Sequence, residues 1–132
     1  MARKSIYHGL EEEKLVGMSM DEYIKVTTSR LRRTLKRLKT NPRLKDFILK
    51  VRRIKEKNPK KVIKTHLRDA VILPEWLGLK FGVHNGKEFK PVDITVDRVG
   101  FRLGDFSHTT TRVLHSGPGI GATRGSKFVS LK

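Results

Sequence analysis

The chain contains no cysteine, no long apolar run and few aromatic residues. Without thiols it has no disulfide framework and no thiolate ligands for a metal ion. The longest uninterrupted apolar stretch, from Ala70 to Leu73, is far shorter than the roughly 20 apolar residues of a membrane-spanning helix. No apolar segment follows the basic residues near the N-terminus, so no secretory signal is expected. These absences predict a soluble, cytoplasmic chain.

The sequence also lacks the patterns of a catalytic or cofactor site. Its five histidines are scattered without the spacing of metal ligands, and its carboxylates are mostly single. Gly117, Gly119 and Ala122 superficially fit a dinucleotide fingerprint, but no strand–turn–helix pattern surrounds them. We therefore expect no metal, no cofactor and no enzymatic activity.

Positive charge is abundant, and it is segregated along the chain. Thirty Lys and Arg residues against thirteen Asp and Glu residues give a net charge of +17. Residues 30–61 hold fifteen basic and two acidic residues, whereas residues 68–106 hold six of each. Residues 107–132 hold four basic residues and no acidic one. A neutral body between cationic flanks predicts an anionic polymer, above all a nucleic acid, as the partner.

Local signals divide the N-terminal part into a leader and a helical region. Residues 1–18 show no clear periodicity and are predicted to form an irregular leader. Residues 19–59 are predicted to be a basic helical region, which Ser19 and Glu22 open with the spacing of a capping box. Asn41-Pro42 ends the first helix and starts the second, and Asn58 ends the second.

Each predicted helix carries an apolar stripe at three- and four-residue intervals. The stripes comprise Ile24, Leu31, Leu35 and Leu38 in the first helix, and Leu44, Phe47, Ile48, Val51 and Ile54 in the second. The first stripe is weak at Thr27 and Thr28. We expect the two stripes to pack against each other as an antiparallel helical hairpin.

Residues 60–106 are predicted to form an α+β core domain. Short β-branched runs, a helical turn at residues 74–78 and another at residues 96–99 alternate there. Asn85-Gly86 predicts a type I′ turn between a strand around Phe81 and Val83 and a return strand from Phe89. Residues 107–132 are rich in glycine and basic, and we expect an extended tail there. The predicted fold class is α+β, with a small sheet and short helices.

The helical region should leave most of its cations outside. Ordinary solvated helices mix both signs of charge, whereas this face has almost no carboxylates, so nucleic-acid binding is favoured over simple solvation. The candidate phosphate contacts there are Arg32, Arg33, Lys36, Arg37, Arg43, Lys50, Arg52 and Arg53. Four aromatic residues of the neutral block are predicted to serve the core or a protein contact rather than base stacking, because large rings are usually buried. These are Trp76, Phe81, Phe89 and Phe106.

The neutral block also carries motifs of a known family. Residues 71–78 read VILPEWLG, residues 83–89 read VHNGKEF, Val99-Gly100 follows, and residues 103–106 read LGDF, with Thr109 three residues later. This pattern resembles the nineteenth protein of the small ribosomal subunit. The basic helices and the ending Gly-Pro-Gly-Ile-Gly-Ala-Thr at residues 117–123 are similar to its archaeal and eukaryotic branch.

The resemblance implies an α+β domain in the head of the small subunit, bound to ribosomal RNA and without catalysis. It implies the thirteenth small-subunit protein as a neighbour and a tail near the decoding region and transfer RNA. By position it adds RNA contacts at Lys64, Thr65, His66, Arg68, Lys87 and Arg112, and Arg124 in the tail. A stand-alone nucleic-acid binder, such as a chromatin or regulatory protein, is the alternative. An enzyme acting on nucleic acid is the weaker one.

Overall fold

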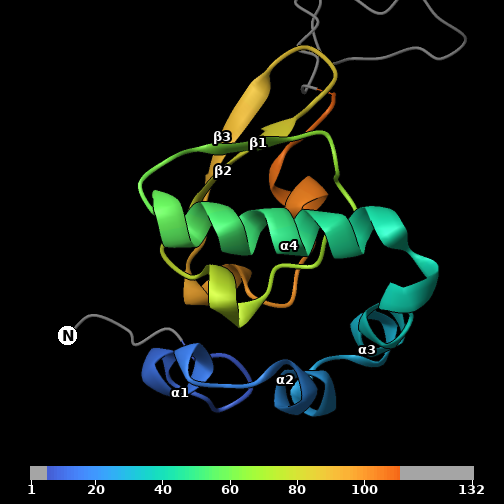
Figure 1. The fold of residues 1–132 in the computed structure, drawn as a ribbon, viewed down its shortest axis with the longest axis vertical. Coiled ribbons are helices and arrows are strands. Elements are labelled where there is room, and N and C mark those ends of the chain that lie inside the picture. The colour runs from blue at the N-terminus through green and yellow to red at the C-terminus, as the bar shows by residue number, and fades with distance from the viewer. Residues whose placement is uncertain (1–5, 111–132) are drawn as a thin grey trace, which may run out of the picture.

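The computed structural model describes residues 6–110. Within them four α-helices, several 3₁₀ turns and a three-stranded sheet confirm the predicted α+β class (Figure 1). Residues 1–5 and 111–132 lie outside the described part, and with them most of the predicted tail.

The leader is not wholly irregular, which corrects the prediction for residues 1–18. It contains helix α1 (Glu12–Val16), whose Leu15 is fully buried. Before α1, His8 and Gly9 both adopt positive φ and close a tight turn in which Tyr7 and Leu10 exchange backbone hydrogen bonds. The Tyr7 ring lies against Gly100, where an added Cβ would come within 2.6 Å of the tyrosine hydroxyl. This segment is therefore ordered by tertiary contacts, although its sequence shows no periodicity.

The first predicted helix is broken at its weak spot. The structure has α2 (Met20–Val26) and α3 (Ser29–Lys36), because Thr27 and Thr28 are both extended. The capping box that opens α2 is confirmed: Ser19 N donates to Glu22 Oε2 at 2.9 Å, and Glu22 N donates to Ser19 Oγ at 3.4 Å. The Ser19 amide and hydroxyl both donate to the Glu22 carboxylate, which lowers the pKa of Glu22 because these bonds favour its charged form.

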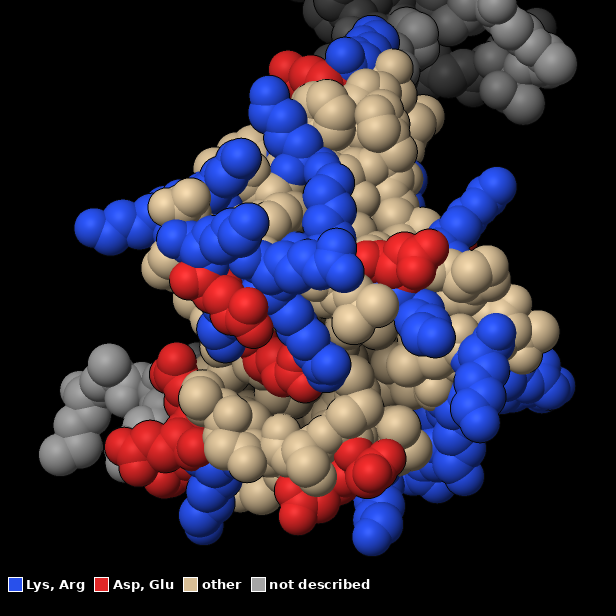
Figure 2. Space-filling view, in the orientation of Figure 1, with Lys and Arg blue, Asp and Glu red and all other residues tan. Residues whose placement is uncertain are grey.

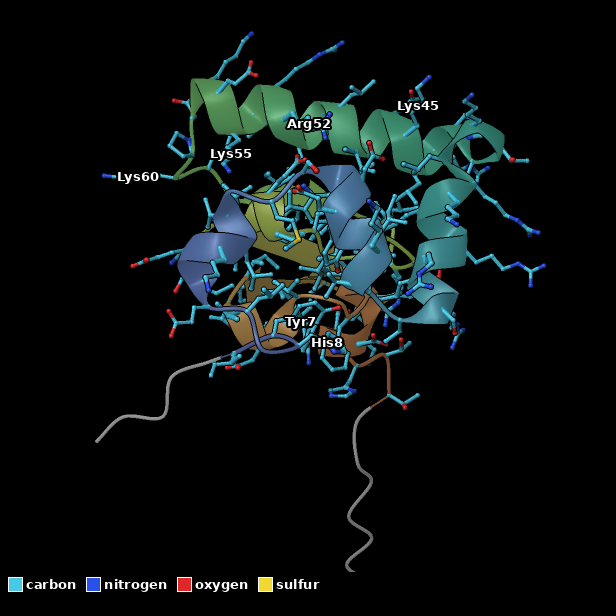
Figure 3. The ribbon with its side chains drawn as sticks, turned by 90° about the horizontal axis from the view of Figure 1, so that it is seen from below. Tyr7, His8, Lys45, Arg52, Lys55 and Lys60 are labelled. Atoms are coloured by element: carbon cyan, nitrogen blue, oxygen red, sulfur yellow. The ribbon has the colours of Figure 1, made fainter. Side chains whose placement is uncertain are left out.

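Helix α4 (Pro42–Lys57) follows the predicted limits. The Asn41 side chain accepts a hydrogen bond from Leu44 N at 3.3 Å, and Pro42 occupies the first turn, where its missing N–H is no loss. The antiparallel hairpin, however, is not formed, since α3 runs transverse to α4 rather than alongside it in the two ribbon views (Figures 1 and 3). The apolar stripe of α4 instead faces the sheet domain, where it finds a larger apolar surface.

The sheet has the order β1-β2-β3. Strand β1 (Ile63–Thr65) pairs in parallel with β2 (Lys80–His84), and β2 pairs antiparallel with β3 (Phe89–Asp93). The hairpin was predicted correctly, but its turn was not. His84 pairs with Phe89, so residues 85–88 form the loop, and in it only Gly86 has positive φ. Asn85 Oδ1 instead accepts from the amides of Lys87 and Glu88, which closes an Asx-type turn.

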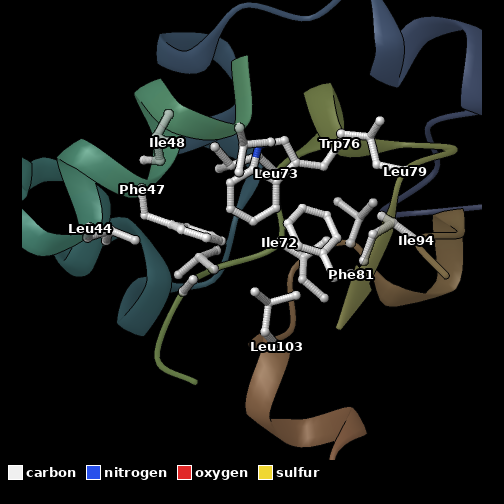
Figure 4. Close-up of a cluster of buried hydrophobic side chains, with 14 of the residues drawn as sticks. Leu44, Phe47, Ile48, Ile72, Leu73, Trp76, Leu79, Phe81, Ile94 and Leu103 are labelled. Carbon is white, nitrogen blue, oxygen red and sulfur yellow. The ribbon is translucent and has the colours of Figure 1, made fainter. Parts of the chain in front are cut away.

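The core lies between α4 and the sheet domain. Phe47 from α4 meets Trp76 edge to face at a ring-centroid distance of 5.7 Å, and Phe81 from β2 lies 5.2 Å from Trp76 (Figure 4). Trp76 is 1% exposed and Phe81 is fully buried. Trp76 belongs to the 3₁₀ turn η2 (Pro74–Trp76). One cluster of apolar side chains thus joins the helical region to the neutral block.

The buried indole offers a test of this packing. Within the described residues, Trp76 Nε1 is buried without a hydrogen-bond partner. We expect Trp76→Ala to lower the free energy of unfolding by about 3–5 kcal/mol through loss of apolar contact and cavity formation. Trp76→Phe should lower it by less than about 2 kcal/mol. The smaller ring loses some apolar contact, but the substitution also removes a buried N–H that has no hydrogen-bond partner in the described part of the chain, which offsets part of the loss. Chemical denaturation followed by circular dichroism measures both. Equal losses would mean that ring contact with Phe47 and Phe81 contributes little.

Candidate nucleic-acid interface

Surface charge is divided between two sides of the molecule. Lys and Arg side chains crowd over α4 and around α3, whereas Asp and Glu gather at the edge formed by α1 and α2 (Figure 2). The exposed carboxylates of that edge are Glu11, Glu12, Glu13, Asp21 and Glu22. A polyanion is therefore attracted to the α3 and α4 side and repelled by the edge of α1 and α2.

The outer face of α4 carries exposed cations because its inner face is apolar. Leu44, Phe47, Ile48 and Val51 are buried, which turns the remaining positions to solvent. Of the predicted contacts, Arg43, Lys50 and Arg53 are exposed, and no ion pair or hydrogen bond of their side chains occurs within residues 6–110. Lys45 and Lys57 are exposed on the same helix. Asp46 and Glu56 are the two carboxylates among them.

Arg52 differs from these cations because its charge is neutralised within the fold. Its Nε and Nη2 atoms donate to the two carboxylate oxygens of Glu75 at 2.9 and 2.8 Å. The hydrogen bond to Glu75 raises the pKa of Arg52 above its ordinary value. Lys55 Nζ donates to the backbone oxygen of Glu75, so the side chains of Arg52 and Lys55 both tie α4 to η2. Lys60, in contrast, points away from the body of the protein (Figure 3).

Arg32 is also used inside the fold. Its Nε donates to the carbonyl of Ile24, and its Nη2 donates to the carbonyls of Lys25 and Thr27, each at 3.0 Å. These are the last carbonyls of α2, which have no partner within the helix. Arg32 therefore acts as a C-terminal cap that holds α2 against α3 across the break at residues 27–28.

The other arginines of α3 line a cleft of about 510 Å³, which we call the arginine cleft. Arg30 and Arg33 lie three residues apart on α3, Arg37 follows as its C-cap residue, and Arg102 reaches the cleft from the neutral block. Ser29 and Thr34 complete the lining, which contains no carboxylate. No side chain caps the α3 N-terminus, whose partial positive charge adds to that of the arginines. This composition is suited to a phosphate group.

The sequence prediction contained Arg33 and Arg37 but missed Arg30 and Arg102. The three-residue spacing from Arg30 to Arg33 was a usable signal. Arg102 lies far away in sequence, and only the tertiary fold brings it to α3. Lys36, which was predicted, is exposed on α3 but does not line the cleft.

The residues suggested by the family resemblance lie around the loop end of the hairpin. Lys64, His66 and Lys87 are exposed there. Arg68 is half-buried and donates to the carbonyls of His84 at 2.7 Å, Gly104 at 3.0 Å and Ser107. Its guanidinium thus fastens the end of β2 to the 3₁₀ turn η4 (Leu103–Phe106).

The remaining predicted residues have varied surroundings. Thr65 is buried and accepts a hydrogen bond from Leu67 N at 3.0 Å, so its side chain serves the chain turn after β1. Phe89 and Phe106 are half-buried, each beneath a cation: Lys64 Nζ lies 5.5 Å from the Phe89 ring centre, and Arg98 lies 5.0 Å from that of Phe106. Arg112 and Arg124 lie outside the described residues.

Residues 6–110 also bear on other classes of site. That range contains no cluster of three His, Cys, Asp or Glu side chains placed to hold a metal ion. None of its helices has the length and apolar character needed to cross a bilayer. The cationic surface is thus the feature of the described chain that most strongly indicates a ligand.

The fold and its charges define a small α+β domain with cations concentrated over two transverse helices. The family model of ribosomal protein S19 matches residues 35–115, which is more than half of the chain. The chain therefore belongs to the ribosomal protein S19 family, as the motifs of the neutral block indicated. It is a protein of the small ribosomal subunit, and this family is of a structural, non-enzymatic kind.

The different positions of Arg32 and Arg33 generate a matched test. Arg32→Ala leaves the terminal carbonyls of α2 without their charged donor, so we expect the free energy of unfolding to fall by about 2 kcal/mol. Arg33→Ala removes the same charge from an exposed position and should change it by no more than about 0.5 kcal/mol. Urea denaturation of the two variants gives the comparison. Similar stabilities would contradict the capping role of Arg32.

Proposed function

We propose that the protein binds small-subunit ribosomal RNA through the outer cations of α3 and α4. The arginine cleft supports this proposal most directly, because it gathers four guanidinium groups from two segments and has no carboxylate in its lining. Guanidinium groups bind phosphate oxygens with two parallel hydrogen bonds. Contacts of this kind fix position on the RNA backbone and read its shape rather than its sequence.

The orientation of the protein on RNA follows from the same charges. The edge of α1 and α2 repels phosphates, so it turns away from the RNA and is open to a protein neighbour. By family resemblance we infer that this neighbour is the thirteenth small-subunit protein. By the same resemblance, we infer that the tail, residues 107–132, is directed toward the decoding region and transfer RNA. The resemblance also implies a cytoplasmic ribosome as the location and no cofactor.

Salt dependence tests the electrostatic part of the proposal. If roughly 6–10 phosphates are contacted, affinity for a small-subunit ribosomal RNA transcript should fall on the order of 10³–10⁵-fold between 50 and 200 mM salt, because counterions are released on binding. Filter binding over a salt series measures this. A flat dependence would rule out phosphate neutralisation as the source of affinity.

A pair of double variants tests which face binds. Arg33→Gln/Arg37→Gln removes two charges from the arginine cleft and should reduce the slope of log affinity against log salt by about 1.5. Lys14→Gln/Lys25→Gln removes two exposed charges from α1 and α2 and should leave the slope nearly unchanged. Equal effects would show that net charge alone matters. Equal affinity for duplex DNA would instead favour a stand-alone nucleic-acid binder.

A further inference from the structure

Three aromatic rings meet at the end of the sheet next to the β2–β3 loop. His66 directly follows β1, His84 ends β2, and Phe89 begins β3. Because β1 is parallel to β2 and β3 pairs His84 with Phe89, all three residues come to the same edge. The His66 and His84 ring centres lie 4.4 Å apart, and Phe89 lies 5.1 Å from His66 and 4.9 Å from His84. Widely separated sequence positions thus build one aromatic cluster.

Two of the rings, those of Phe89 and His84, support the third. Phe89 is half-buried beneath the Lys64 ammonium, and His84 is half-buried with its Nδ1 accepting a hydrogen bond from Gly86 N at 3.0 Å. His66 is the exposed member. No hydrogen bond of the His66 ring occurs within residues 6–110, so contact with the other two rings holds it in place. The cluster therefore presents a supported aromatic ring to solvent.

The charges around this ring suit a nucleic acid. Lys64 and Lys87 are exposed beside it, and Glu88 in the hairpin loop is the nearby carboxylate. A ring face attracts another flat π-system, whereas a phosphate is bound by donors at a ring edge or by an ammonium group. A metal ion does not fit, because the Nδ1 lone pair of His84 is already used. The exposed face of the His66 ring is thus suited to a base, with the lysines available to the adjoining phosphates.

We propose that an unpaired RNA base stacks on the exposed face of His66, supported from behind by His84 and Phe89. The inference rests on the proposed RNA-binding function and adds to it a second chemistry, base stacking, at a place distinct from the arginine cleft. Aromatic residues are scarce in the sequence, which argued against an extended stacking platform. One supported ring nevertheless suffices for a single base.

Two probes isolate the stacking contact. The first is a single-stranded oligouridine with a central 2-aminopurine, and the second carries an abasic residue at that position. Stacking quenches 2-aminopurine fluorescence, and the full chain should bind the first probe more tightly than the second. Loss of a base–aromatic stack corresponds to a decrease in affinity of roughly 5- to 160-fold. Equal affinity for both probes, without quenching, overturns the proposal.

Four variants separate ring from charge. His66→Asn should lose the 2-aminopurine preference and the quenching, whereas His66→Phe should retain both. His66→Lys introduces a cation without a ring and should not restore them. His8→Asn is the matched control, since His8 is also exposed but packs edge-on against Tyr7, and asparagine tolerates its positive φ. Restoration by Lys but not by Phe would overturn stacking in favour of an ionic contact.

The outcomes also distinguish this inference from the proposed function. Steep salt dependence with ribosomal RNA, combined with no preference for the base over the abasic residue, would reject stacking alone. A flat salt dependence would reject the proposed function, whichever probe binds. Circular dichroism checks that each variant is folded, and if His66→Asn is not, the comparison of the two probes on the unaltered protein still decides.

Discussion

The packing of Phe47 against Trp76 and Phe81 is the contact on which the rest of the structure depends. A chain with a net charge of +17 repels itself, and the helical region carries most of the unbalanced cations. The apolar stripe of α4 offsets this repulsion because it shares one buried cluster with the sheet domain. The same contact fixes the rotation of α4 about its axis. Since the stripe faces inward, Arg43, Lys50 and Arg53 must face outward.

The arginines serve two purposes that residue type alone does not separate. Arg32, Arg52 and Arg68 each donate to carbonyl or carboxylate oxygens of the fold, and together they hold α2, η2 and η4 in place. Such donors lose little by leaving water, because protein oxygens replace it. Within residues 6–110 the arginines of the cleft have far fewer protein acceptors, and Arg102 lies 3.6 Å from Asp69. Their remaining donors stay available for a ligand.

The features predicted correctly from the sequence are local ones. The capping box at Ser19, the Asn41-Pro42 boundary and the β2–β3 hairpin depend on neighbouring residues, so their patterns are visible in the chain. The transverse orientation of α3 to α4, the cap formed by Arg32 and the docking of Tyr7 on Gly100 depend on distant residues. The fold class and the face of α4 were therefore predictable. The arginine cleft was predictable only in part, and the aromatic cluster was not, because parallel pairing of β1 with β2 creates it.

Three carboxylates of the neutral block have cationic partners within the fold, and these pairs bear on binding. Glu75 pairs with Arg52 at 2.8 Å, Asp69 lies 3.6 Å from Arg102, and Asp93 lies 3.8 Å from Lys80. These carboxylates are matched locally, so they do not screen the outer cations of α3 and α4. The acidic edge of α1 and α2 then makes the molecule electrically polar. A polar body of this kind orients before it makes contact with a polyanion, which brings the arginine cleft rather than α1 to the phosphates.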